Sequence, residues 1–242
     1  IGKGNQTYRI ERYAIESMPT DTMLDGGIVN LEAVSECLQR GWKRMGTRQR
    51  NVALALPVTD VITKKIIVPA GQREDDLAFQ VETEASQYIP FSLDEVDLDF
   101  QVIRPTPNNP EEVEVLIAAS RKEKVEDRVA AALSGGLKTI IMDVESYAAQ
   151  AAFELTLGQL PEGGKDKVIA LVDIGATVMK INVFHNGESV YARDQPFGGN
   201  QLTQEIGNQF NLSLEESEIA RRNGNLPDNY KTDVLQPFCE TL

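Results

Sequence analysis

The chain has 242 residues, which at roughly 150 residues per domain corresponds to one large domain or two modest ones. Its 24 basic and 37 acidic residues give a formal net charge of −13, a balance that disfavours a nucleic-acid-binding protein and direct docking on anionic lipid. Two distant cysteines and one histidine exclude a disulfide framework and leave little material for a His-based zinc site or a Ser-His-Asp triad.

The sparse cysteine usage predicts a reducing cytoplasm as the compartment. No run approaches 18 apolar residues, and no basic region followed by an apolar region opens the chain. The chain begins abruptly at Ile1 without an initiator methionine, and we interpret it as a fragment whose first strand is missing.

Apolar periodicity and turn residues predict alternating strands and helices over the first half. Asn30 is placed to cap a helix that ends at Gly46, and the acidic trio at 74–76 suits the start of a helix that ends before Pro90. The strands expected in this half lie at 8–13, 51–57, 60–69, 95–103 and 113–120.

The segment 95–103 alternates strictly, with Asp97 and Asp99 on its polar face, and therefore predicts a half-solvated strand. A Pro- and Asn-rich loop is expected at 105–110. Ser120 and Glu123 have the spacing of a capping box, which predicts that the next helix begins at Ser120.

The second half begins with a buried strand at 138–144 and a small-residue helix at 145–156. The segment 158–167 is the most linker-like stretch, and we expect a domain boundary there. Two strands joined to a third by the Asn186-Gly187 turn follow. Helices are then expected after Gly198-Gly199 and from a second capping box that begins at Ser213, before an incomplete C-terminal helix.

The segment VDIGAT at 172–177 is the first candidate binding site. Asp173, at the end of a buried strand, could direct its carboxylate toward a hydrated Mg²⁺. Gly175 permits close approach of a phosphate, to which the amides of the turn at Ala176 and the hydroxyl of Thr177 could donate. The strand–turn–strand context differs from a Walker loop, although an ordinary hairpin turn has the same residues.

Two further elements extend this candidate site. Gly198 and Gly199 precede a helix whose N-terminal amides could bind phosphate, although a Gly pair also serves a simple change of direction. Glu218 and Arg221 share one helix face and could bracket a ribose or purine, or be a solvated pair.

The order of these elements resembles one half of the actin/Hsp70 ATPase superfamily. DIGATVMKINVF is similar to its second phosphate motif, GGNQLTQEI to its Gly-Gly turn and helix, and EIARRNG to its E-x-x-K-x-x-x-G nucleoside motif, with Arg221 in place of Lys. The stretches VITKKIIVP, EASQYIPFSLDEVDLDFQVI, VLIAASRKEKVEDR and MDVESYAAQAAF, in this order before VDIGAT, resemble the PilM family of actin-like proteins of the type IV pilus assembly platform.

The resemblance implies an α/β, actin-like (ribonuclease H-like) fold with an inserted 1C subdomain like that of the division protein FtsA. It implies subdomain 1A at 1–27 and 138–165, 1C at 28–137, 2A at 166–198 and the start of 2B at 199–242. It also implies that the first phosphate loop precedes Ile1 and that the Gly-rich adenosine motif follows Leu242.

The resemblance further implies ATP and Mg as ligands, at most slow hydrolysis, and a cytoplasmic location. PilM proteins bind the N-terminal cytoplasmic peptide of the membrane protein PilN between 1A and 1C, so that the inner membrane and other platform proteins are reached through a partner. One candidate for peptide binding is the turn of Tyr88, Ile89, Pro90 and Phe91. The alternative is that this turn plugs the core under a loop. The peptide could also bind as an added strand at an exposed edge of 1C.

Two other functions stay open. One is an adaptor whose nucleotide site is vestigial. The other is a small-molecule kinase of the same superfamily, which ranks lower because the insert at 28–137 has the pattern of a compact α+β module rather than of a substrate pocket.

Overall fold

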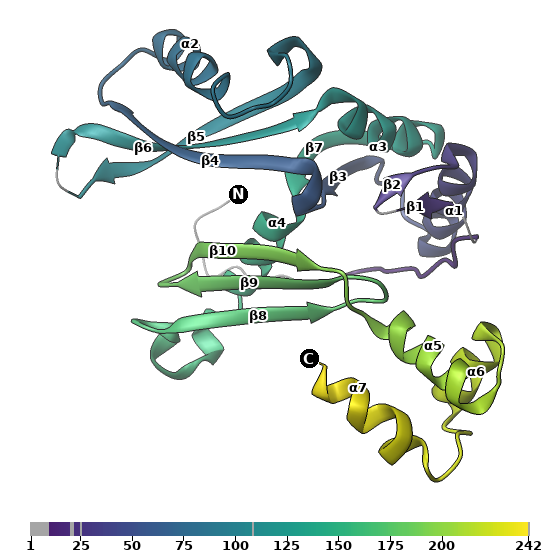
Figure 1. Cartoon of the computed structure of the whole chain (residues 1–242). Coiled ribbons are helices and arrows are strands. Elements are labelled where there is room, and N and C mark those ends of the chain that lie inside the picture. Colours follow the sequence, from purple (N-terminus) through teal and green to yellow (C-terminus); the bar gives the residue numbers. More distant parts are fainter. Residues whose placement is uncertain (1–9, 20–21, 25, 108, 242) are drawn as a thin grey trace. The chain divides into compact units, whose positions relative to one another are not determined.

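The computed structural model describes residues 10–19, 22–24, 26–107 and 109–241 (Figure 1). The chain divides into two compact units, Ile1–Ala148 and Ala149–Leu242. None of the helices in the described ranges combines the length and the apolar character that crossing a bilayer requires.

One layer of the first unit is built from helices α1 (Leu31–Met45) and α3 (Lys122–Ser134) on the parallel strands β3 (Asn51–Leu56) and β7 (Lys138–Val144). The Asn30 side chain accepts from the amide of Ala33, and Gly46 adopts a left-handed conformation with φ 60°, so both predicted ends of α1 are confirmed. The core of this layer consists of Val52, Ala132 and Leu137, with Leu38, Trp42 and Leu54 packed against them. The short strands β1 (Met23–Leu24) and β2 (Gly27–Ile28) form a hairpin before α1.

The other layer is an antiparallel sheet with the order β4–β6–β5. Its strands are β4 (Val61–Pro69), β5 (Val96–Thr106) and β6 (Asn109–Arg121), and helix α2 (Glu74–Ala85) covers one face (Figure 1). The short helices η1 (Val58–Asp60) and η2 (Leu93–Glu95) precede β4 and β5. The face under α2 is the larger core, made of Ile66, Val68, Val81, Ala85, Ile89, Val96, Val115, Ile117 and Ala119.

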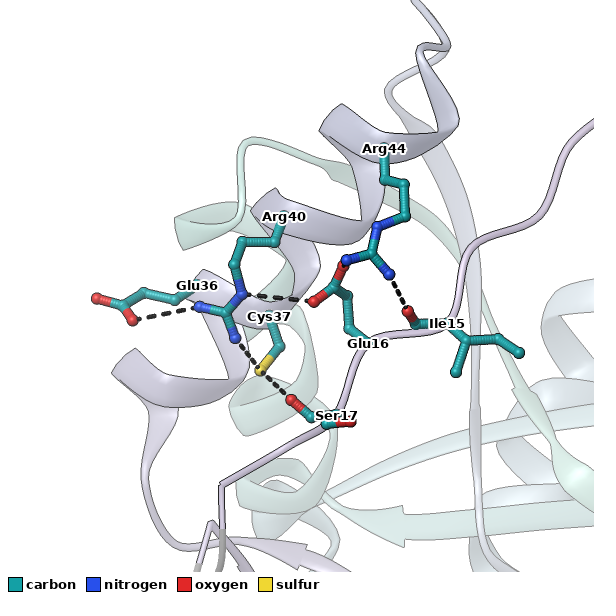
Figure 2. Close-up of polar contacts among 7 residues, drawn as sticks. All are labelled: Ile15, Glu16, Ser17, Glu36, Cys37, Arg40 and Arg44. Atoms are coloured by element: carbon teal, nitrogen blue, oxygen red, sulfur yellow. Dashed lines mark hydrogen bonds and ion pairs between the residues drawn. The ribbon is translucent and has the colours of Figure 1, made fainter. Parts of the chain in front are cut away.

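The strand expected at 8–13 is wrong for its described part, because residues 10–19 have no regular secondary structure; residues 8 and 9 lie outside the described ranges. Figure 2 shows how this segment is fastened to α1 instead. Arg44 donates to the Ile15 carbonyl at 2.6 Å, and the Glu16 carboxylate lies 3.0 Å from Arg44 and 3.5 Å from Arg40. The Cys37 thiol, to which Arg40 donates at 2.9 Å, is directed to the Ser17 carbonyl.

Two other local expectations are wrong. Ser120 does not cap α3: it lies in β6 opposite Val61, its hydroxyl donates to the Asp60 carbonyl at 2.8 Å, and the helix begins at Lys122. The loop expected at 105–110 is largely strand, since β5 continues to Thr106 and β6 starts at Asn109. In both places the pairing of neighbouring strands prevails over a local turn or cap signal.

Helix α4 (Glu145–Glu154) begins in the first unit and ends in the second. The second unit contains the antiparallel sheet β10–β9–β8, with strands β8 (Val168–Ile174), β9 (Met179–His185) and β10 (Glu188–Gln195). Its helices are α5 (Gly199–Phe210), α6 (Leu214–Asn223), the π-helical turn η5 (Lys231–Leu235) and α7 (Gln236–Glu240). The capping box expected at Ser213 is confirmed, with Glu216 as its second member.

The division between the units falls before the segment expected to be a linker. Phe153 of α4 stacks on Phe184 of β9 with ring centroids 4.9 Å apart. The segment 158–167 contains the short helices η3 (Leu157–Gln159) and η4 (Pro161–Gly164), and Gly164 packs so closely on Ile169 that a methyl group there would lie 2.9 Å from its Cδ1. The layer of α1, β3, α3 and β7 joins residues of the expected 28–137 and 138–165 segments, and the subdomain boundaries stay a prediction.

Candidate functional site

The turn between β8 and β9 holds the first predicted site residues. The Gly175 amide donates to the Val178 carbonyl at 3.0 Å, which closes a tight turn over Ala176 and Thr177. A side chain at Gly175 would lie 2.9 Å from the same carbonyl oxygen, so this position requires glycine for its close packing. Both Ala176 and Thr177 are exposed.

The second predicted element, Gly198-Gly199, packs directly on this turn. The Gly199 amide donates to the Gly175 carbonyl at 3.0 Å, and the Asn200 amide donates to the Ala176 carbonyl at 2.8 Å. A methyl group on Gly198 would overlap the Ala176 carbonyl. Two glycine-containing turns that are about 25 residues apart in sequence are therefore held together by backbone hydrogen bonds.

This pairing changes which groups can bind an anion. We expected free amides at the start of α5, but those of Gly199 and Asn200 are engaged by carbonyls of the first turn. By contrast, the amides of Ala176 and Thr177 donate to no acceptor among the described residues. The Ala176 and Thr177 amides, with the Thr177 hydroxyl, are the donors that a phosphate could use here.

Asp173 lies next to this turn, and its surroundings differ from the expectation. β8 is an edge strand rather than a buried one, with Val172 49% and Ile174 51% exposed, and the Asp173 carboxylate is exposed as well. Register places Asp173 opposite Lys180 of β9, which in turn lies opposite Asp194 of β10. A basic side chain thus stands between two carboxylates on one face of the sheet.

Asp173 belongs to no cluster of three or more His, Cys, Asp or Glu side chains suited to a metal within the described ranges. A magnesium ion at this place would therefore need water and phosphate oxygens for most of its coordination. That requirement fits Mg²⁺, which retains several waters in protein–phosphate sites.

Glu218 and Arg221 on α6 have different surroundings, and their role at a nucleoside stays a prediction. Glu218 forms an ion pair with Arg222, one helical turn further on. The Arg221 side chain is half-buried, and its Nε atom is buried without a hydrogen-bond partner in the described chain. Burial raises the pKa of the nearby Tyr230 hydroxyl, and the positive charge of Arg221 opposes that rise. No contact joins Glu218 or Arg221 to the paired turns among the hydrogen bonds and ion pairs of the described residues.

The first unit contains a groove whose lining residues the sequence did not identify. It has a volume of about 270 Å³ and lies where the β4–β6–β5 sheet meets α3 and the β3–β7 pair. Its apolar floor consists of Leu56, Val61, Leu98, Ala118, Ala119, Val125, Met142 and Val144. Three carboxylates, Asp97, Asp99 and Asp143, line it as well. The alternation at 95–103 had assigned Asp97 and Asp99 to a solvated strand face, and only the fold reveals their apolar neighbours.

The end of the groove is stiffened by tertiary contacts. Ser120 is bonded to the Asp60 carbonyl, and the Asp60 carboxylate lies 3.6 Å from Arg128 of α3. Burial raises the pKa of Tyr147, just after β7; a side-chain hydrogen bond with Thr63 of β4 opposes this, and the Asp143 charge adds to it.

A second cavity of about 480 Å³ lies on the other side of β5. Its lining is more polar and comes from α2, η2 and the start of α3: Glu82, Leu93, Asp94, Val96, Asp97, Leu98 and Lys122. The Lys122 ammonium donates to the Asp94 carbonyl at 2.7 Å. The first residues of β5 therefore border both cavities.

The turn at 88–91, predicted to bind peptide, has one residue in the core and the others on the surface. Ile89 is buried in the α2-covered core, as the alternative of a plug under a loop expected. Tyr88 and Phe91 are exposed and lie beside cations: Lys64 Nζ is 4.5 Å from the Tyr88 ring centroid, and the Arg121 guanidinium is 5.2 Å from that of Phe91. None of the four residues lines either cavity.

Comparison with known proteins places this architecture in a family. The model of the type IV pilus assembly protein PilM matches residues 1–242. A chain of the PilM–PilN type IV pilus biogenesis complex is similar at 27% identity and a TM-score of 0.71, over 92% of this chain and 66% of that one. This chain therefore spans slightly less than two thirds of the length of that relative.

Two weaker similarities are to ethanolamine utilization protein EutJ from Carboxydothermus hydrogenoformans and to MreB5 of Spiroplasma citri bound to ADP. The first has 15% identity and a TM-score of 0.46, over 83% of this chain and 49% of that one. The second has 16% identity and a TM-score of 0.40, over 83% and 43%. On the family match over its whole length and the PilM superposition, the chain belongs to the PilM family of type IV pilus assembly proteins and has its actin-like α/β fold.

Proposed function

We propose that this protein is a nucleotide-binding, actin-like scaffold of the type IV pilus assembly platform that binds ATP in its second unit and the N-terminal cytoplasmic peptide of PilN in its first. The observation that carries the proposal is the pairing of the turn at Gly175–Thr177 with Gly198-Gly199. It brings together the two elements that the sequence had assigned to phosphate binding.

For the nucleotide, the available donors are the Ala176 and Thr177 amides and the Thr177 hydroxyl, and the adjacent Asp173 carboxylate would hold magnesium through water. Bound Mg²⁺ would neutralise phosphate charge. Lys180, between Asp173 and Asp194, would keep the local charge from becoming strongly negative and so favour the approach of an anion.

The nucleotide half is tested by calorimetry of Mg·ATP binding to the full-length protein. We expect Asp173→Ala to weaken Mg·ATP binding by about tenfold or more, since it removes a charge-assisted magnesium contact. ATP without magnesium should bind the variant and the unchanged protein alike. Asp228→Ala, an exposed carboxylate elsewhere in the second unit, serves as the matched control. Equal Mg·ATP affinity for all three proteins would remove the role assigned to Asp173.

For the partner, the groove of the first unit is the site that we propose, because it combines an apolar floor with carboxylates on rigid strands. The solved complex to which this chain is similar contains PilM and PilN. An integral membrane partner would hold an acidic protein at the inner membrane without direct lipid contact. The exposed turn of Tyr88 and Phe91 is not the site that we favour, because its rings already lie beside Lys64 and Arg121.

The partner half is tested by titrating the protein with the synthetic PilN leader peptide. Ala118→Phe fills the groove and should weaken binding at least tenfold, whereas Val102→Phe, exposed on the same sheet but outside the lining, should leave the affinity unchanged. Thermal unfolding of both variants checks that the first unit remains folded. Undiminished binding to a folded Ala118→Phe variant would exclude this groove.

One observation favours an adaptor without nucleotide as the second candidate function. The amides of Gly199 and Asn200 are occupied by chain carbonyls, which removes two of the expected phosphate donors. The two titrations decide between the candidates: a protein that binds the leader peptide but no nucleotide is the adaptor.

A further inference from the structure

Basic residues gather at the C-terminal end of α1, in a chain that is acidic on average. Five of the eleven residues at 40–50 are Lys or Arg, and none is Asp or Glu. Arg12 of the 10–19 segment joins them, because its guanidinium donates to the Met45 and Gly46 carbonyls at 2.7 and 2.8 Å. We call five exposed residues at this place the basic corner: Arg12, Lys43, Arg48, Arg50 and Lys138.

Hydrogen bonds to backbone carbonyls hold the basic corner together. Trp42 Nε1 donates to the Gln49 carbonyl at 2.7 Å, which folds the residues after α1 back against the helix. The Lys138 amide donates to the Arg50 carbonyl at 2.7 Å, at the start of the β3–β7 pair. The five side chains therefore start from neighbouring pieces of backbone, although Arg12 and Lys138 are far apart in sequence.

The charges of the basic corner are not neutralised by the described chain. Arg40 and Arg44, also on α1, are both paired with Glu16. By contrast, no carboxylate of the described residues forms an ion pair with any member of the corner. The negative end of the α1 dipole accounts for Lys43 in the last turn, but the two arginines of the following loop lie beyond it. Because like charges repel one another, this cluster favours an anionic surface outside the chain as its counterpart.

Exposed apolar side chains lie beside the basic corner. Tyr13 and Ile15 follow Arg12 in the same segment and are 79% and 75% exposed. The Ile15 carbonyl accepts from Arg44 at 2.6 Å, and the Ile15 side chain is directed away from α1 (Figure 2). The segment is thus fastened to the helix by its polar groups while these two apolar side chains remain in solvent. Neither of the two cavities described above includes any of these residues.

We propose that the basic corner, together with Tyr13 and Ile15, docks this protein on the anionic phospholipid surface of the inner membrane. Lys and Arg are attracted to the negatively charged cytoplasmic leaflet, and their long stems carry the charge to the headgroups. A Tyr ring and an aliphatic side chain beside them enter the interfacial layer and add the apolar contribution that surface binding requires. The formal net charge of −13 argues against lipid contact for the chain as a whole, but exposed charges more than roughly 8 Å away are largely screened.

A membrane fits this surface better than another protein does. An acidic protein segment would satisfy the charges, but it gains less from Tyr13 and Ile15, which are exposed and do not line a cavity. The choice of the inner membrane rests on the proposed function, in which an integral partner brings the protein there. That partner by itself requires no lipid contact. The basic corner adds one, and so fixes which face of a tethered molecule is turned to the bilayer.

Flotation of the full-length protein with lipid vesicles, without peptide or nucleotide, tests the proposal. One set of vesicles contains phosphatidylethanolamine with about a third phosphatidylglycerol, and the other contains phosphatidylethanolamine and phosphatidylcholine only. We expect binding to the anionic vesicles at low salt that falls as salt is added, and about tenfold weaker binding or less to the zwitterionic set. Equal binding to both sets, or binding to neither at low salt, would overturn the proposal.

Removal of charge tests whether the basic corner is the surface that binds. Each basic residue near an anionic leaflet contributes about a fivefold gain in binding. The triple variant Lys43→Gln, Arg48→Gln and Arg50→Gln should therefore bind anionic vesicles roughly a hundredfold more weakly. Exchange of the same three residues for the other basic type keeps the charge and should restore binding. Thermal unfolding checks that both variants are folded, and undiminished binding by a folded Gln variant would overturn the proposal.

The matched control removes the same charge from exposed lysines of the second unit, Lys165→Gln, Lys167→Gln and Lys231→Gln, and should bind like the unchanged protein. Tyr13→Ser with Ile15→Ser should weaken binding about tenfold with the same dependence on salt. An equal loss in the lysine control, or no loss in the Tyr13 and Ile15 variant, would overturn the docking surface.

A second copy of this chain is the other acidic occupant that the test must separate from lipid. Salt-sensitive dimers in sedimentation, absent from the triple Gln variant and not dispersed by anionic vesicles, would overturn lipid docking in favour of self-association. The vesicles carry neither nucleotide nor the PilN leader, so a failure of lipid binding leaves the proposed function intact. Conversely, a protein that binds anionic vesicles but neither ATP nor the leader would overturn the proposed function alone.

Discussion

The described part of the chain contains two antiparallel sheets of three strands each, and they differ in how completely they are covered. In the β4–β6–β5 sheet, α2 seals one face, and Val115 on the central strand is 0% exposed. In the β10–β9–β8 sheet, Phe184 on the central strand is sealed by Phe153, but Val172 on the edge strand remains 49% exposed.

The difference teaches that an apolar strand sequence does not by itself report burial. β8 reads VIALVDI, more apolar than β5, yet it is the more exposed of the two. β5 is an edge strand as well, but its Val96 and Leu98 pack into the core under α2, whereas Val168, Val172 and Ile174 of β8 remain in contact with solvent. The protein places its phosphate-binding candidates at the end of this open strand, while the proposed partner groove lies beside the well-covered sheet.

The sharpest test of the comparison uses the same substitution in both sheets. Val115→Ala removes two methyl groups from a sealed core and should lower the free energy of unfolding by about 2–3 kcal/mol. Val172→Ala, half-exposed at the edge, should cost less than about 1 kcal/mol. Denaturant unfolding followed by circular dichroism measures both. Similar losses for the two variants would mean that β8 is covered in solution and would break the comparison.

Substitutions at the adjacent Gly198 and Gly199 test how the two turns pack at the end of β8. Gly198→Ala would place a methyl group on the Ala176 carbonyl and should separate the two turns, at a cost of about 1–3 kcal/mol, together with weaker Mg·ATP binding. Gly199→Ala meets only an ordinary contact, 3.9 Å from the Gly175 carbonyl oxygen, and should be nearly neutral. Thermal unfolding and calorimetry of both variants provide the measurement. A stable Gly198→Ala protein with unchanged nucleotide affinity would contradict the packing of the turns.

The smallest expected effect concerns the capping box of α6. Hydrogen bonds from the Ser213 hydroxyl and amide lower the pKa of Glu216 below its ordinary value of 4.5. Because the folded pKa is the lower one, the contribution to stability is present above pH 4.5 and is lost as the pH falls through the folded pKa. Glu216→Gln should therefore show a shallower fall of the thermal midpoint below pH 4.5 than the unchanged protein. Glu215→Gln is the control, and parallel curves for Glu216→Gln and the unchanged protein would contradict the assignment.

Features that depend on a few neighbouring residues could be predicted from the sequence. Asn30 and the Ser213 capping box begin their helices, and Gly46 ends α1, as expected. Each cap needs only the adjacent turn of backbone. Ser120 shows where this reasoning fails. The same four-residue pattern lies at the end of β6, and pairing with β4 together with the bond to the Asp60 carbonyl keeps Ser120 in the strand.

The candidate site likewise has features that could be predicted from the sequence and features that could not. The glycine-containing turns at 175–177 and 198–199 could be picked out because tight turns restrict residue type, but their mutual hydrogen bonds could not be foreseen. The residues that line the groove beside Asp97 and Asp99 escaped prediction, because alternation reports two faces of a strand without showing what lies opposite each face.

By itself, the sequence determined the caps at Asn30, Gly46 and Ser213, the turn glycines, the alternation of β5 and the family of the chain, because each of these depends on residues close together or on their order. The tertiary structure decided which strands lie at an edge, which glycine amides are already bonded and where carboxylates meet apolar side chains. The physical reason is that pairing and burial are settled between segments far apart in the chain, and no local pattern specifies its distant partner.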